Sequence, residues 1–347
     1  MRIILASTFV PFINGGARFI VEWAEDKLRE AGHEVERFYL PFVDTPYDLL
    51  DQAAGFRMMD LAQWSDRLIA FRPPAYVIPH PDKVLWFIHH IRTLYDLWDG
   101  PFAPAKTPDT RAVRDNLHAL DTAAFGEARR VYTNSQVVSD RLKRFNGVSS
   151  EPLYPPIWAP ERFRCDGYGD EVLVVCRAEP HKRQHLLVEA MAHVTTPVRL
   201  RLCGRTTGPA YANRIRQEIR DRALHDRVAF EDRWISEEEK ADLIAGALAM
   251  AYLPEDEDSY GYPSLEAAHA GKCVLTTTDS GGVLELVEDG RNGLVAEPEP
   301  RAVAAALDRL WRDKDATRRM GEANRDRLGE LRIDWTRVVE ALGGPTA

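Results

Sequence analysis

Short β-rich runs alternate with longer amphipathic segments along this chain, and the alternation stops once, at Tyr154-Pro155-Pro156-Ile157-Trp158-Ala159-Pro160. Proline cannot continue a helix or sit inside a sheet, so this segment is predicted to link two domains. The alternation itself is typical of parallel sheets with crossover helices. A length of 347 residues also exceeds what one compact core usually absorbs. The sequence therefore predicts an α/β protein of two Rossmann-like domains with mostly parallel sheets.

We place the first domain at residues 1–155, the second at 156–330 and a C-terminal helical segment at 331–347. The pattern from residue 316 to residue 342 is helical throughout. Gly32 is predicted to end the first helix. Ser135 is predicted to cap the helix at residues 136–145. Ser236 begins a Ser-x-x-Glu capping box with Glu239.

The formal net charge of −9 disfavours nucleic acid and anionic lipid as partners, because like charges repel. No apolar run approaches the ~20 residues that cross a bilayer, so no transmembrane segment is expected. The N-terminal run Met1–Ala6 is better explained as a first strand than as a signal peptide. The four cysteines form no Cys-x-x-Cys pair and indicate neither a metal site nor a redox centre. We expect a cytoplasmic protein, and a homodimer is compatible with the sequence.

An acid–glycine–proline pattern covers the loop and helix from Asp258 to Glu266. Pro263 suits a first helical turn, and unsatisfied amides at such a helix start bind phosphate. Glu266 is expected to accept hydrogen bonds from ribose hydroxyls, while Asp258 faces a sugar. An ordinary capped helix with surface acids fits the spacing equally well. The residues expected to bind a nucleotide here are Gly261, Tyr262, Ser264, Leu265 and Glu266.

Two cations follow the predicted strand at residues 171–176. Arg177 stands at its end and Lys182 comes five residues later, at a predicted helix start. Cations at the carboxyl edge of a sheet can neutralise charge on a departing diphosphate. A solvated basic loop is the alternative for either residue taken alone.

Four further strand ends carry weaker signals. Gly15 and Gly16 link the first strand to the first helix and would allow close approach of a phosphate or acceptor. Gly204 ends a later predicted strand and faces the proposed cleft, and Arg233 follows the strand that ends near Phe230. Both are weaker candidates for contacts with the nucleotide. His89 and His90 stand at the end of the apolar strand at residues 84–89 and face the proposed cleft, and His89 is preferred over His90 by a small margin. Arg92 and Asp96 either bind an acceptor or pair with each other.

Together these motifs resemble the retaining glycosyltransferases of family 4, also called glycosyl transferases group 1. The stretch ending at Glu266 is similar to their E-x7-E motif, with Asp258 in place of the first Glu. Glu255 and Glu257 lie close by, but the register favours Asp258. Arg177 and Lys182 match the family's Arg–Lys pair, and Arg183 stands where a Gly commonly follows. The resemblance covers nearly the whole chain and is strongest from Arg177 to Gly293.

The resemblance implies the GT-B fold, with an acceptor-side first domain and a donor-binding second domain. It also implies that the C-terminal helix crosses back to the first domain. The donor would be a nucleotide-diphosphate sugar, such as a UDP or GDP sugar, and the acceptor a hydroxyl of a glycan, a lipid-linked molecule or a small molecule. The expected catalytic residues are Arg177, Lys182, Asp258 and His89. No Asp-x-Asp motif is suitably placed, so no metal or other cofactor is expected.

Two other functions remain compatible with the sequence. The first is another enzyme of the same fold, a nucleotide-sugar epimerase or a phosphorylase. A phosphorylase would also need a cofactor-bearing Lys and a longer chain. The second is a non-catalytic sugar-nucleotide binder, for which Asp258 in place of Glu is the only support in the sequence.

Overall fold

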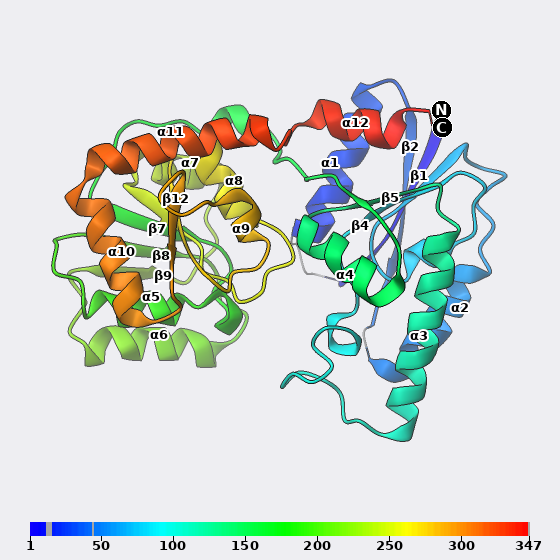
Figure 1. Cartoon of the computed structure of the whole chain (residues 1–347), viewed down its shortest axis with the longest axis horizontal. Helices are drawn as coiled ribbons and strands as arrows, with labels where there is room; N and C mark the ends of the chain where they lie inside the picture. The colour runs from blue at the N-terminus through cyan, green and yellow to red at the C-terminus, as the bar shows by residue number, and fades with distance from the viewer. Residues whose placement is uncertain (12–15, 44, 346–347) are drawn as a thin grey trace. The chain divides into compact units, whose positions relative to one another are not determined.

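The computed structural model describes residues 1–11, 16–43 and 45–345. Contacts between residues divide the chain into two units (Figure 1). The first unit consists of Met1–Pro155 and Ile333–Ala347, and the second unit of Pro156–Arg332. The division between Pro155 and Pro156 falls inside the proline-rich segment. Within the described ranges, no helix is both long and apolar enough to span a bilayer.

The first unit is built on a six-stranded parallel sheet with the strand order β2-β1-β3-β4-β5-β6. Alternate residues of a strand point to opposite faces, so both faces of this sheet carry a core. Helices α1 and α12 cover one face, and α2, α3 and α4 cover the other. The elements are β1 (Arg2–Phe9), α1 (Gly16–Glu30), β2 (Glu34–Pro41), α2 (Pro46–Arg57), β3 (Arg67–Ala70), η1 (Ala75–Val77), β4 (Lys83–Phe87), η2 (Arg92–Leu94), α3 (Pro108–Gly126), β5 (Arg130–Thr133), α4 (Gln136–Asn146), β6 (Glu151–Pro152) and α12 (Trp335–Gly343).

The second unit repeats this plan with the strand order β12-β11-β10-β7-β8-β9. Its main core lies between one face of the sheet and helices α5, α6 and α10. The order reverses between β7 and β10, the position at which doubly wound sheets bind ligands. The elements are η3 (Pro160–Arg162), β7 (Glu171–Val175), η4 (Pro180–Lys182), α5 (Gln184–Met191), β8 (Arg199–Cys203), α6 (Pro209–Asp221), β9 (Val228–Glu231), α7 (Glu237–Gly246), β10 (Ala249–Ala251), α8 (Tyr262–His269), β11 (Val274–Thr277), α9 (Val283–Leu286), β12 (Gly293–Ala296), α10 (Pro300–Arg312) and α11 (Lys314–Glu330).

The C-terminal segment is two helices where the sequence pattern predicts one. Helix α11 ends at Glu330, and Arg332 adopts a left-handed conformation with φ +53°, which a continuous helix cannot contain. Asp334 then caps α12 by accepting a hydrogen bond from the Arg337 amide at 2.8 Å. The amphipathic pattern of residues 316–342 therefore spans a turn that periodicity alone does not reveal.

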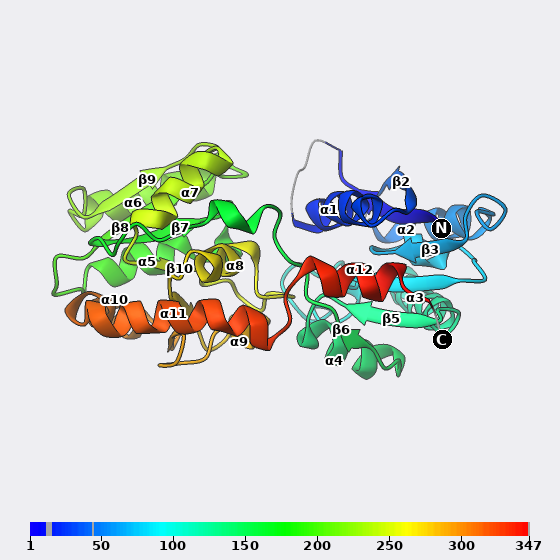
Figure 2. The same ribbon diagram turned by 90° about the horizontal axis from the view of Figure 1, so that it is seen from above.

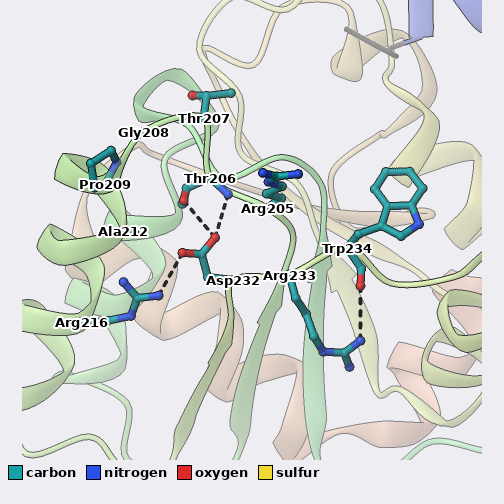
Figure 3. A pocket seen from close by; sticks show the side chains of 10 residues that line it. All are labelled: Arg205, Thr206, Thr207, Gly208, Pro209, Ala212, Arg216, Asp232, Arg233 and Trp234. Carbon is teal, nitrogen blue, oxygen red and sulfur yellow. Dashed lines mark hydrogen bonds and ion pairs between the residues drawn. The ribbon is translucent and has the colours of Figure 1, made fainter. Parts of the chain in front are cut away.

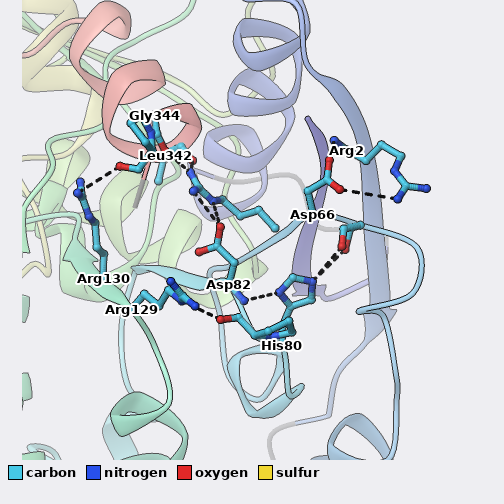
Figure 4. A network of polar contacts seen from close by, with 12 residues as sticks. Arg2, Asp66, His80, Asp82, Arg129, Arg130, Leu342 and Gly344 are labelled. Atoms are coloured by element: carbon cyan, nitrogen blue, oxygen red, sulfur yellow. Dashed lines mark hydrogen bonds and ion pairs between the residues drawn. The ribbon is translucent and has the colours of Figure 1, made fainter. Parts of the chain in front are cut away.

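Helix α12 belongs to the core of the first unit. Helix α12 lies beside α1 (Figure 2). Its Val338 and Leu342 side chains pack on the sheet face that α1 covers, and Arg337 donates to the Pro152 carbonyl of β6. The buried Arg67 side chain donates to the carbonyls of Leu342 at 2.7 Å and Gly344 at 2.6 Å (Figure 4). The last helix thus helps to cover one face of a sheet whose first strand begins at Arg2.

The predicted helix caps at Gly32, Ser135 and Ser236 are confirmed, although the Glu239 carboxylate of the predicted capping box pairs with Arg233. Ser135 Oγ accepts from the Val138 amide at 3.1 Å, and Ser236 Oγ accepts from the Glu239 amide at 3.0 Å. Gly32 follows α1 with φ +87°, as expected of a glycine C-cap.

We expect Ser236→Ala to lower the free energy of unfolding by about 1 kcal/mol, because the Glu239 amide loses its acceptor. Urea denaturation of the two proteins measures the difference. Ser236→Asp, which keeps a side-chain acceptor, is the matched control and should stay close to the native stability. Equal losses in both variants would show that the cap does not stabilise α7.

Candidate active site

The predicted cations and acids converge where the strand order of the second unit reverses. Arg177 and Lys182 follow β7, and the residues from Tyr252 to Asp258 follow β10, which pairs with β7 in the sheet. Parallel strands bring their carboxyl ends to the same edge, so the two loops are neighbours. The structure therefore brings together two sequence signals that lie about 80 residues apart.

Lys182 is the centre of this group of side chains. Its Nζ donates to the Tyr252 hydroxyl at 2.7 Å, forms an ion pair with Glu257, and lies 5.1 Å from the centre of the Tyr252 ring. The Lys182 side chain is 11% exposed, so the ammonium group is held in one place at the edge of the site. The Tyr252 hydroxyl also donates to Glu257, at 3.0 Å, and completes a three-residue cluster.

Glu257, rather than Asp258, is the acid that the structure pairs with Lys182. Burial opposes ionisation of Glu257, but the charge and hydrogen bond of Lys182 outweigh burial and lower the pKa of this carboxyl. The loop is fixed by backbone hydrogen bonds from the Glu255 amide to the His181 carbonyl and from the Gly282 amide to the Glu257 carbonyl, both 2.8 Å. Asp258 is the next residue along this fixed loop and is partly exposed. Its expected sugar contact stays a prediction.

The start of α8 differs in detail from the sequence expectation. The Ser264 amide donates to the Gly261 carbonyl at 3.2 Å, so it is engaged inside the first turn instead of pointing outward. Ser264 Oγ is buried and has no hydrogen-bond partner among the described residues. Leu265 is fully buried in the helix. Gly261 has φ +70°, and a Cβ there would lie 2.4 Å from Cε1 of Tyr252. The glycine therefore admits the same tyrosine ring that contacts Lys182.

Glu266 lies on α8 and is 6% exposed. Its carboxylate pairs with Lys240 of α7 at 2.5 Å, and Lys240 also contacts Glu237 at 2.9 Å. Burial raises the pKa of Glu266, and the attraction of Lys240 partly offsets this effect. The sequence did not suggest Lys240, because no pattern relates two residues 26 positions apart on different helices.

Arg177 differs from Lys182 in its surroundings. Its guanidinium is 50% exposed and pairs with Glu179 at 2.7 Å. A surface ion pair of this kind contributes little to stability, so the charge of Arg177 is available at the carboxyl edge of β7.

The loops that follow β8 and β9, together with the first half of α6, border a cavity of about 500 Å³ (Figure 3). Asp232 fixes its floor by accepting from the Thr206 amide at 2.8 Å and from Arg216 at 2.9 Å. Trp234 is 70% exposed at the rim, and Arg233 is held by Glu231 at 2.6 Å and by Glu239. Gly204 lies just before this loop, and a Cβ there would be 1.8 Å from the Cys176 carbonyl oxygen. The lining residues are Arg205, Thr206, Thr207, Gly208, Pro209, Ala212, Arg216, Asp232, Arg233 and Trp234.

The remaining predicted residues belong to the first unit. His89 is partly exposed, and its Nδ1 lies 2.7 Å from the His90 carbonyl oxygen, so Nδ1 carries the proton and Nε2 can accept a hydrogen bond. Burial lowers the pKa of His89 to about 4, which keeps the ring neutral. His90 is buried and hydrogen-bonds Asn146 at 2.8 Å.

Arg92 pairs with Asp96 at 2.7 Å. Gly16 begins α1, and Gly15 lies outside the described residues.

The fold is that of the GT-B glycosyltransferases. Over 99% of this chain and 98% of the other, the structure matches HepE of Anabaena, solved in complex with UDP, with a TM-score of 0.75 and 19% identity. It matches sucrose-phosphate synthase of Thermosynechococcus elongatus over 98% of this chain and 97% of the other, with a TM-score of 0.76 and 19% identity. The prediction of two Rossmann-like domains in a GT-B fold is confirmed.

Sequence comparison finds a family match within the second unit. Residues 165–327 match the family model of glycosyl transferases group 1. The chain is 32% identical to an alpha-1,3/1,6-mannosyltransferase, ALG2, of Dictyostelium discoideum over 118 residues, which are 33% of this chain and 27% of that protein. It is 31% identical to a glycogen synthase of Mycobacterium tuberculosis over 242 residues, which are 66% of this chain and 56% of that protein. The matched part of this chain thus spans about a quarter of the length of the mannosyltransferase and about half of the length of the glycogen synthase.

Proposed function

We propose that this protein is a retaining, metal-independent glycosyltransferase that moves a sugar from a nucleotide-diphosphate sugar to an acceptor hydroxyl. The observation that carries the proposal is that Arg177, Lys182 and the start of α8 lie at the carboxyl edge of the second sheet, where the strand order reverses between β7 and β10. The residues that form this sheet match the group 1 family model. Tyr252 connects these parts, since one ring contacts both Lys182 and Gly261. UDP, bound in the similar HepE structure, is the first donor nucleotide to test.

In the proposed reaction the acceptor oxygen bonds to the anomeric carbon while the bond from that carbon to the diphosphate oxygen breaks. Negative charge builds on the departing diphosphate, and Arg177 and Lys182 stabilise it. The acceptor proton passes to the departing phosphate oxygen on the same face of the sugar, so the anomeric configuration is retained. The cavity beside Trp234 is proposed to take the nucleotide base, with Glu266 on the ribose hydroxyls.

The test is incubation with UDP-, GDP-, dTDP- and ADP-sugars, with release of the nucleoside diphosphate and the melting temperature as readouts. We expect one nucleotide to raise the melting temperature, because a ligand of the folded state stabilises it by mass action. Release should continue in EDTA, and NMR of the product should show the donor's anomeric configuration. Binding without release, even with a panel of acceptors, would contradict the transferase proposal and indicate a sugar-nucleotide binder.

A further inference from the structure

Arg183 occupies an unusual position immediately after Lys182. Its backbone lies in the left-handed region, with φ +54° and ψ +36°, where most residues with a side chain are strained. Its side chain is nevertheless 11% exposed and fully engaged. A strained backbone with a well-satisfied side chain indicates that the surrounding contacts impose this conformation.

The contacts of the Arg183 guanidinium reach the ends of two neighbouring strands, β10 and β11. It donates to the carbonyls of Leu253 and Pro254 after β10, each at 2.8 Å, and to Thr277 Oγ1 at the end of β11, also at 2.8 Å. It forms a two-point ion pair with Asp279, with both distances 2.7 Å. The hydrogen bonds of Arg183 lower the pKa of Asp279, which keeps this carboxylate charged. A planar guanidinium suits such a fork, and lysine cannot replace it.

Asp279 also connects this arginine to the acidic loop. Its backbone carbonyl accepts from the Asp256 amide at 2.9 Å, while its carboxylate holds Arg183. The turn that carries Lys182 and the loop that carries Glu257 are therefore anchored to the same residue. Any movement of Asp279 would change the distance between the Lys182 ammonium and the Glu257 carboxylate.

We propose that the Arg183–Asp279 pair is a positioning device that holds Lys182 and the acidic loop in the geometry that sugar transfer needs. The inference rests on the proposed function for its kinetic consequence, and its structural part stands independently. Arg183 itself acts through Lys182 and touches no substrate.

The main test uses Arg183→Gly, which removes the side chain and relieves the backbone strain, so the variant is expected to fold. We expect kcat to fall about 10- to 100-fold with a donor KM within about threefold of the native value, because a misplaced group loses mainly transition-state stabilisation. Asp279→Asn should act in the same direction. The double variant should be no worse than Arg183→Gly, because both changes break one device.

The matched control is Arg227→Ala, at the amino end of the same sheet. Arg227 donates to the backbone carbonyls of Val194, Thr196 and Val198, so it loses comparable hydrogen bonds far from the site. It should lower the melting temperature and leave kcat unchanged. Native kcat in Arg183→Gly, or an equal drop in both variants, would overturn the proposal.

Hydrogen exchange separates this inference from the proposed function. Amides of residues 181–183 and 255–258 should exchange faster in Arg183→Gly than in the native protein, and they should be unaffected in Arg227→Ala. Faster exchange in a protein that transfers no sugar would refute the transferase proposal alone. Unchanged exchange would refute the positioning role, whatever the enzyme assay shows.

Discussion

Lys182→Met should lower kcat by about 10²- to 10³-fold, the range found when one preorganised charge is removed from a developing anion. The Lys182 ammonium is held by Tyr252 and Glu257 at the carboxyl end of β7, where the diphosphate is proposed to leave. Methionine keeps the length of the side chain and removes its charge. Single-turnover measurement with the donor identified by the nucleotide screen reports the effect on the chemical step.

The loss of Lys182 also leaves the Glu257 carboxylate without its cation in a largely buried position, so the single variant loses stability as well. The double variant Lys182→Met/Glu257→Gln separates the two effects. Glutamine removes the unpaired charge, so we expect the melting temperature to recover while kcat stays low. Recovery of turnover in the double variant would show that Lys182 serves only to neutralise Glu257.

The parts of the fold that the sequence predicts are those set by local chemistry. Ser135 and Ser236 cap helices through bonds to amides three residues away, and Gly32 ends a helix through its own φ. The β/α alternation then gives the two parallel sheets, because right-handed crossovers allow few other topologies. The break at Arg332 escaped prediction because the helical periodicity continues through it.

The parts of the site that the sequence did not predict depend on contacts between distant segments. Whether Glu257 or Asp258 meets Lys182 depends on a one-residue register in a loop. That register is set by the hydrogen bonds from the Glu255 amide to the His181 carbonyl and from the Gly282 amide to the Glu257 carbonyl. Sequence spacing contains no information about these partners. The same holds for Lys240 and Glu266, whose helices are brought together only by the packed sheet.

Lys240→Met should destabilise the second unit by about 3–5 kcal/mol, the usual cost of removing one partner of a buried ion pair. Glu266 is 6% exposed and pairs with Lys240, so the variant must either bury an unpaired carboxylate or protonate it. Lys314→Met is the matched control. Lys314 pairs with Asp170 at 2.6 Å on the surface, and its loss should cost less than about 1 kcal/mol.

The destabilisation caused by Lys240→Met should depend on pH in a defined direction. Burial raises the pKa of Glu266 above its unfolded value, so the folded protein holds this proton more tightly, and its contribution to stability declines as pH rises. Removing Lys240 raises the pKa of Glu266 in the folded protein further. The pH range over which the variant loses stability therefore extends to higher pH. Urea denaturation should therefore show a larger loss at pH 8 than at pH 5. In Lys240→Met/Glu266→Gln the difference in stability loss between pH 8 and pH 5 should disappear. Nucleotide binding should be weaker than in the native protein, since the proposed ribose contact needs the carboxylate. An equal loss at both pH values would contradict the predicted coupling between Lys240 and the ionisation of Glu266.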